Sequence, residues 1–194
     1  LTALYQLAKA AVEKEDYAEA KELLLRAVGE YPHNLGEGKL ESGQENNLYY
    51  LLGLVQEKLG EAKDAFESLT RACCGESEPV GMMYYNDQPP EMIYYQGLAY
   101  RMLGEEEQAV RRFQKLVDYG REHIRDDVKI DYFAVSLPDL LIFEENLNER
   151  NRKHCLFMMS LGLKGLGRID EAEKCAEELL AMDNAHQEIR VHDL

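Results

Sequence analysis

The 194-residue sequence is poor in positive charge. It has 22 Lys and Arg residues against 37 Asp and Glu residues, which gives a formal net charge of −15 with histidine neutral. Such an excess of negative charge repels phosphate backbones and anionic lipid headgroups. We therefore expect neither nucleic acid nor a membrane as the partner of this protein.

The sequence also lacks the segments that address a chain to a membrane. No run approaches the roughly 18 apolar residues that a membrane-spanning helix requires, and the N-terminus shows no basic and then apolar signal peptide. The chain begins at Leu1, inside a predicted helix, so we expect it to be a piece of a longer protein whose targeting signal is not visible. A cytoplasmic location is the prediction that these features favour.

Cysteines are few, and they form no CxxC pair. We predict that all four stay reduced and pack as small apolar side chains, with Cys74 and Cys175 in the second helices of helical pairs and Cys155 in a first helix. The five histidines are scattered, so no ligand set with the spacing of a zinc site is present. The sequence therefore predicts that neither these three cysteines nor the fourth, Cys73, binds a metal.

The motifs of common enzyme classes are missing as well. The sequence contains no GxSxG, no HExxH and no GxxxxGK[ST]. The glycine-rich run at residues 162–167 has the wrong glycine order for a phosphate-binding loop and no predicted strand before it. Acidic runs such as residues 105–107 fall at helix starts, where their negative charges interact favourably with the helix dipole while they remain solvated. We predict a protein that is not an enzyme and needs no cofactor.

A repeated pattern of small and large residues is what the sequence does contain. In residues 90–123 the spacing of Gly97, Gly104, Ala109 and Phe113 predicts two short amphipathic helices joined by a tight turn. A small residue at Gly97 allows close approach, Gly104 ends the first helix, and Ala109 lies where the helices cross. The same pattern recurs in residues 1–34, 46–79 and 153–186.

These four segments resemble the tetratricopeptide repeat, a 34-residue helical hairpin. Equivalent alanines stand at Ala20, Ala65, Ala109 and Ala172, and the usual turn glycine is present in three copies, with Glu15 replacing it in the first. The resemblance implies an all-α fold, a right-handed superhelix of about four helical hairpins that forms a single domain over residues 1–194. A last short helix over residues 185–193 is predicted to cover its end.

Three insertions separate the repeats. The equivalent alanines lie 45, 44 and 63 residues apart, so the additions fall at residues 35–45, 80–89 and 124–152. They carry apolar segments at residues 82–85 and 130–143, and Pro138 suits the first turn of a short helix that runs to about Phe143. Because so much apolar surface needs cover, we predict that the insertions line or partly roof the concave face.

Position 5 of each repeat, which faces the concave surface in this family, is aromatic in all four copies. The binding hypothesis treats these rings as the floor of a groove for a peptide or a sugar; the alternative is that the insertions fold back and bury them. Lys9 follows in the first repeat, and the Lys and Asn clamp that holds chaperone C-termini is not present. The candidate contacts are Tyr5, Tyr50, Tyr94, Phe157, Tyr85, Asn86, Asp87 and Arg101.

A second resemblance extends beyond the repeats. The segments YYNDQPPEMIYYQGLA and KIDYFAVSLPDLLIF look like the C-terminal helical part of large bacterial proteins whose N-terminal half is a β-rich domain of unknown function with a link to carbohydrates. Two functions therefore stay open. One is an interaction scaffold for a protein segment or a neighbouring domain of the same chain. The other is an accessory module in carbohydrate metabolism that contacts a glycan or small polar ligand, or positions a catalytic domain.

Overall fold

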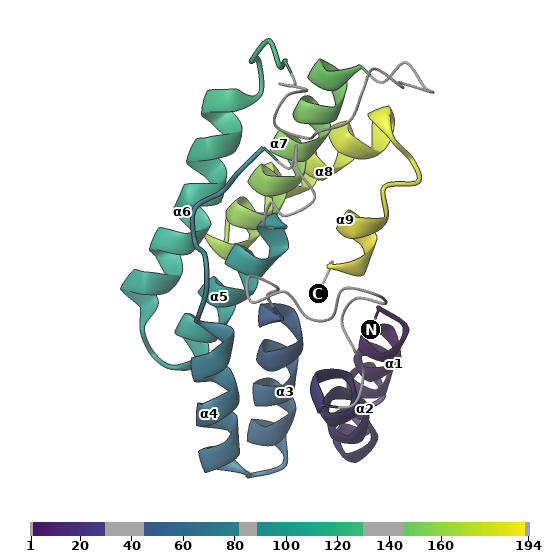
Figure 1. Cartoon of the computed structure of the whole chain (residues 1–194), viewed down its shortest axis with the longest axis vertical. Helices are drawn as coiled ribbons and strands as arrows, with labels where there is room; N and C mark the ends of the chain where they lie inside the picture. The colour runs from purple at the N-terminus through teal and green to yellow at the C-terminus, as the bar shows by residue number, and fades with distance from the viewer. Residues whose placement is uncertain (1, 30–44, 82–88, 130–145, 193–194) are drawn as a thin grey trace, which may run out of the picture. The chain divides into compact units, whose positions relative to one another are not determined.

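The computed structural model describes residues 2–29, 45–81, 89–129 and 146–192, and this part of the chain contains helices and no strand (Figure 1). This confirms the predicted all-α fold. The helices are α1 (Thr2–Glu13), α2 (Tyr17–Gly29), α3 (Asn46–Lys58), α4 (Ala62–Ala72), α5 (Pro90–Met102), α6 (Glu106–His123), α7 (Leu147–Gly165), α8 (Ile169–Met182) and α9 (Gln187–Val191).

The chain divides into two compact units. The first comprises Leu1–Ser77 and Glu91–Arg112, and the second comprises Glu78–Pro90 and Phe113–Leu194. The first unit therefore holds α1 to α4, nearly all of α5 and the start of α6, whereas the rest of α6 belongs to the second unit with α7, α8 and α9. The single domain over residues 1–194 stays a prediction.

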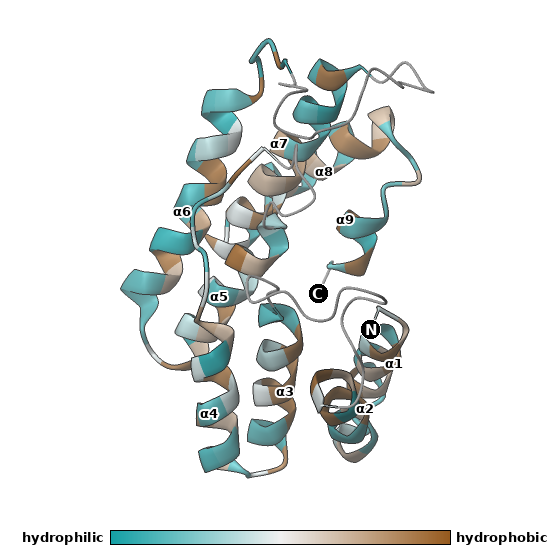
Figure 2. Cartoon of the chain, in the orientation of Figure 1, coloured by the Kyte–Doolittle hydropathy of each residue, from teal (hydrophilic) through white to brown (hydrophobic). Residues whose placement is uncertain are grey.

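The helix boundaries agree closely with those expected from the repeats. The repeats predicted over residues 1–34, 46–79 and 90–123 contain α1 with α2, α3 with α4 and α5 with α6. The fourth repeat, predicted over residues 153–186, contains α8 and most of α7, which begins earlier at Leu147, and the predicted last helix is the shorter α9. Hydrophobic and hydrophilic residues alternate around these helices, as amphipathic packing requires (Figure 2). The short helix expected between Pro138 and Phe143 and the apolar segment at residues 82–85 lie outside the described residues.

One turn geometry joins the helices of every pair. A residue in the left-handed conformation follows each first helix, with φ between 60° and 81°, and the next backbone N–H donates to the carbonyl five residues earlier at 2.9 Å. This is the Schellman arrangement, which satisfies carbonyls that a helix end leaves open. Glu15 thus adopts the same conformation as the glycines at the equivalent positions. The four residues are Glu15, Gly60, Gly104 and Gly167.

Small residues allow the two helices of a pair to pack closely. A Cβ added to Gly53 of α3 would lie 2.6 Å from Cγ of Leu69 and 3.3 Å from the carbonyl oxygen of Ala65, both in α4. Ala65 itself is 4% exposed, and Ala109 is fully buried. The sequence pattern therefore marks true crossing points, where no larger side chain fits without movement.

Each first helix also packs on the second helix of the preceding pair. In the first unit α3 packs against α2, and Ala99 of α5 joins Leu69 of α4 in one buried cluster. In the second unit α7 packs against α6, since a Cβ added to Gly162 would lie 2.6 Å from the carbonyl oxygen of Phe113. The sequence pattern assigned Gly162 no role beyond the glycine-rich run at residues 162–167, and the structure shows that it is a packing position.

Buried amide side chains hold the ends of the second helices. Gln96 of α5 is fully buried; its Nε2 donates to the carbonyls of Cys74 at 3.1 Å and Glu76 at 2.8 Å, and its Oε1 accepts from Arg112 Nε at 3.1 Å. In the second unit Asn151 Nδ2 donates to the carbonyl of the last α6 residue at 2.7 Å. These bonds satisfy backbone carbonyls that water would otherwise have to solvate.

The cysteines differ in their surroundings. Cys155 is buried in α7 as expected, and burial raises the pKa of its thiol to about 12. Cys175 of α8 is only half-buried. The expectation that Cys74 packs in a second helix is wrong, because α4 ends at Ala72 and Cys74 lies exposed beyond that end. Cys73, which caps α4, is half-buried, and desolvation raises its thiol pKa to about 12.

Replacing Glu15 with glycine should stabilise the first unit. A left-handed residue other than glycine costs about 1–2 kcal/mol, part of which is lost again because glycine makes the unfolded chain more flexible, so we expect a net gain of about 0.5–1 kcal/mol. Gly104→Ala is the matched control, since no atom lies within 4 Å of the added Cβ. It should destabilise by about 1 kcal/mol through backbone conformation alone. Urea unfolding that moves both variants in the same direction would contradict this account.

Enlarging a crossing position should destabilise strongly. We expect Gly53→Leu and Ala109→Leu each to lower the unfolding free energy by about 1–3 kcal/mol or more, because the added side chain has no room between the helices. Glu105→Ala, at an exposed position, should change it by less than about 0.5 kcal/mol. Thermal unfolding of the three variants tests this, and equal shifts in Tm would show that the repeat register is misplaced.

Candidate binding surface

Tyrosines from three first helices gather in the first unit. The predicted lane residues Tyr5 of α1, Tyr50 of α3 and Tyr94 of α5 all interact with Tyr95. The ring centre of Tyr95 lies 5.5 Å from that of Tyr50 and 5.6 Å from that of Tyr94, and its hydroxyl is 2.8 Å from the Tyr5 hydroxyl. We call these four residues the tyrosine cluster. Its rings meet in tilted and edge-to-face geometries that aromatic pairs favour.

Most of the tyrosine cluster is interior. Tyr5 and Tyr94 are each 3% exposed and Tyr95 is fully buried, whereas Tyr50 is half-buried. Burial raises the pKa of the Tyr5 and Tyr95 phenols well above the ordinary value, because an ionised phenolate would lose its hydration there. The cluster is thus a packed layer of neutral phenols, and Tyr50 is the member that reaches the surface.

Arg101 lies at the edge of this layer. Its guanidinium forms a two-pronged contact with Glu106, at 3.0 Å from Nε to Oε2 and 2.7 Å from Nη2 to Oε1, while about 39% of the side chain stays exposed. Burial raises the pKa of Tyr50, and the positive charge of Arg101 opposes that rise, whereas Glu57 adds to it. Tyr50, Arg101 and the exposed carboxylates of Glu57 and Glu106 therefore share one electrostatic neighbourhood, which we call the Tyr50 rim.

The remaining predicted contacts are not part of this cluster. Phe157 belongs to the second unit, where it is 3% exposed and its ring centre lies 5.5 Å from that of His186. Tyr85, Asn86 and Asp87 lie outside the described residues. The structure therefore brings together four of the eight predicted residues, namely Tyr5, Tyr50, Tyr94 and Arg101.

Tyr95 is the member of the tyrosine cluster that sequence reasoning missed. It stands one position after the lane, at position 6 of its repeat. The signal was available, because the residues at position 6 of the second and fourth repeats are Leu51 and Met158, and both are buried. A position that is apolar in two of the other three repeats indicates a core site, and a tyrosine there needs a partner for its hydroxyl. Tyr5 supplies that partner.

The described residues offer no other chemistry at this surface. Within them, no three His, Cys, Asp or Glu side chains are grouped so that they could hold a metal ion. Among the helices that the structure describes, none is long and apolar enough to cross a membrane. What the Tyr50 rim provides is an aromatic ring, an oriented cation and two carboxylates, which are groups that bind a partner.

Antiparallel helical pairs with a shared turn and crossing point define a helical-repeat protein. Models of the tetratricopeptide repeat match residues 5–79 and 91–119, and the chain belongs to this family. Its repeats generally mediate protein interactions and are typically non-catalytic, so a protein–protein interaction scaffold is the function class. The fourth pair, α7 with α8, lies outside the matched ranges and repeats the same turn geometry.

Two solved structures are similar to this chain. The alignment with a crystal structure of MamA covers 95% of this chain and 79% of the MamA chain, with 19% sequence identity and a TM-score of 0.34. The alignment with a second crystal structure of MamA protein covers 98% of this chain and 75% of that chain, with 19% sequence identity and a TM-score of 0.33.

The buried phenols should make the first unit sensitive to alkali. Their folded-state pKa values lie above the ordinary tyrosine value of about 10, so their contribution to stability is complete below that pH and is lost as the pH rises further. Urea unfolding at about pH 8 and about pH 11 should show a smaller loss of stability in the Tyr5→Phe, Tyr95→Phe double variant than in the parent. Tyr17→Phe, outside the cluster, is the matched control. Equal losses in parent and double variant would contradict the burial of these hydroxyls.

Proposed function

We propose that this chain is a non-catalytic scaffold that binds a protein segment, or a neighbouring domain of the same chain, through the concave face formed by the first helices. The observation that carries the proposal is the Tyr50 rim. There α3 and α5 present a partly exposed tyrosine ring and an exposed arginine next to each other, over a packed tyrosine layer.

Tyrosine and arginine are the residue types that dominate the energetics of protein interfaces. Both are already held in place here. The ring of Tyr50 rests against Tyr95, and the guanidinium of Arg101 is oriented by Glu106. Because these side chains lose little freedom when a partner arrives, more of the contact energy appears as affinity. The packed layer below thus supports binding without itself being the contact.

The charges of the rim define the chemistry of the segment. Glu57 and Glu106 are exposed carboxylates on a chain of net charge −15, so a segment with basic side chains would be attracted to the rim. The ring of Tyr50 would accept an apolar or aromatic side chain between those bases. The other predicted contacts, Phe157, Tyr85, Asn86 and Asp87, remain candidates for the same partner.

The glycan alternative has less support. Sugars are held by exposed aromatic faces, and the burial of Tyr5, Tyr94 and Tyr95 leaves Tyr50 as the one ring of the tyrosine cluster with appreciable exposure. An accessory role in a carbohydrate-metabolism protein would then rest on placing a neighbouring domain. A titration of the chain with a panel of oligosaccharides in a calorimeter tests direct glycan contact.

The proposal predicts a binding defect at the rim. In a selection from a displayed library of random peptides, the bound sequences should be rich in basic and aromatic residues. Tyr50→Ala should weaken the selected peptides by about 2 kcal/mol, or roughly 30-fold. We expect a loss of similar size for Arg101→Ala, because the loss of a preorganised contact outweighs the removal of one positive charge next to a basic peptide. Arg111→Ala is the matched control, because Arg111 is also exposed and paired with a glutamate of its own helix, Glu107.

Fluorescence anisotropy with labelled peptides measures these affinities, and circular dichroism checks that each variant is folded. A selection that yields no peptide, or peptides equally sensitive to Arg111→Ala and Arg101→Ala, would reject the proposal. Oligosaccharide binding that is lost in Tyr50→Ala would favour the glycan alternative instead.

A further inference from the structure

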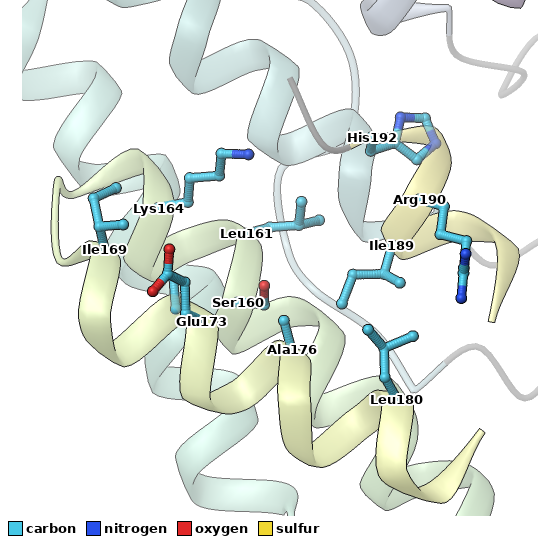
Figure 3. A pocket seen from close by; sticks show the side chains of 11 residues that line it. Ser160, Leu161, Lys164, Ile169, Glu173, Ala176, Leu180, Ile189, Arg190 and His192 are labelled. Carbon is cyan, nitrogen blue, oxygen red and sulfur yellow. The ribbon is translucent and has the colours of Figure 1, made fainter. Parts of the chain in front are cut away.

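A pocket of about 230 Å³ lies between α7, α8 and α9 in the second unit (Figure 3). Its floor is apolar, and Figure 3 shows Ala176 and Leu180 of α8 facing Ile189 of α9. The charged groups around it are Lys164, Glu173 and Arg190. We call this pocket the α8 groove.

The α8 groove occupies a face that other pairs of this chain cover with a helix. The residue nine positions after the left-handed turn residue is Leu24, Leu69 or Phe113 in the first three pairs, and each is at most 4% exposed. Leu69 is buried against α5, and the backbone of Phe113 contacts α7. The equivalent residue of α8 is Ala176, which is half-buried and lines the groove. This is the face on which a following helix packs.

The helix that follows α8 covers only part of this face. α9 has 5 residues, whereas α3 and α5, which follow the first two pairs, each have 13. The space left is smaller than the roughly 300–1,000 Å³ of a typical small-molecule site. It suits a few apolar side chains from one face of a helix, and alanine in place of leucine or phenylalanine at position 176 provides room for them.

The negative charge of Glu173 indicates which kind of side chain an occupant of the α8 groove would place beside it. In the first pair, Lys21 stands six residues after the left-handed Glu15 and forms an ion pair of 2.5 Å with Glu61, in the turn of the next pair. The equivalent residues of the second and third pairs are the apolar Phe66 and Val110, so this ion pair belongs to the first pair alone. In the fourth pair the position holds Glu173, six residues after Gly167, whose charge is opposite to that of Lys21. An occupant in the same position therefore needs a base where this chain has Glu61.

From these observations we propose that the α8 groove is a docking site for an amphipathic helix of a partner protein, which inserts an apolar stripe beside Ala176 and Leu180 and places a Lys or Arg opposite Glu173. The inference rests on the proposed scaffold function and adds a second surface to it. The partner expected at the α8 groove is a helix, whereas the partner expected at the Tyr50 rim is a segment with basic and aromatic side chains.

The test uses the whole chain and a displayed library of 13-residue amphipathic helical peptides, with apolar residues at i, i+3, i+4 and i+7 and varied charges. Ala176→Glu places a charge in the groove and should weaken the selected peptides at least about tenfold. Ala181→Glu introduces the same change at an exposed position of α8 outside the groove lining and should leave binding unchanged.

A charge exchange then tests the expected base. Glu173→Lys should weaken a selected basic peptide about tenfold, and changing the basic residue of that peptide to Glu should restore binding. This rescue requires proximity of the two groups, so a general loss of structure cannot imitate it. Thermal unfolding confirms that each variant is folded.

The outcomes separate this inference from the proposed function. Peptides that depend on Ala176 but not on Arg101 support the α8 groove and count against the Tyr50 rim. Peptides that depend on Arg101 alone support the proposed function and overturn the α8 groove. Self-association that is measured by sedimentation and lost in Ala176→Glu would show that the occupant is a second copy of the chain, which also overturns the proposal.

Discussion

The left-handed residue after each first helix is the constraint on which the rest of the structure depends. It reverses the chain within three residues, so the second helix runs back along the first in a fixed register. The crossing alanine then follows five residues later, and nine residues later the second and third pairs have a residue that packs on the next pair. Where glycine holds this conformation the turn is free of side-chain strain, and at Glu15 the same geometry persists although a left-handed residue with a side chain is strained.

When helices pack closely, the backbone carbonyls at their ends are the main polar groups that lack a hydrogen-bond partner. Buried amide side chains supply that partner here. Gln96 makes three hydrogen bonds without any exposure to water. Each bond contributes only about 0.5–1.5 kcal/mol, but an unsatisfied partner would cost about 1–3 kcal/mol. Asn46 also serves the end of α4, since its Nδ2 donates to the carbonyls of Ala72 and Cys74 at 2.7 and 2.8 Å, although its own Oδ1 is buried without a hydrogen-bond partner among the described residues. The amides therefore specify where the chain leaves each second helix.

The fold could be predicted from the sequence because its determinants are local. A turn residue, a crossing alanine and an apolar stripe recur at fixed spacings, and each acts within one hairpin. The misses are of a different kind. Cys74 falls one residue beyond the cap of α4, a boundary that spacing alone does not define. Gly162 contacts the backbone of Phe113, and Tyr95 pairs with Tyr5, which is 90 residues away in the sequence. Contacts between pairs depend on how the hairpins stack, and a pattern within one repeat does not contain that information.

Aromatic residues on the first helices thus serve two purposes that compete for the same rings. Burying Tyr5, Tyr94 and Tyr95 stabilises the stack of first helices but removes their surface from any partner. The compromise is a rigid interior with a small exposed rim, in which Tyr50 gains orientation from the buried ring of Tyr95 and Arg101 gains it from the exposed Glu106. A partner therefore finds few anchors, but these are preorganised, and binding strength then depends on their placement more than on the area covered. In the second unit the balance is reversed. Ala176 leaves space where the other pairs place a large side chain, so that face gives up part of its own packing and becomes available to a helix from outside.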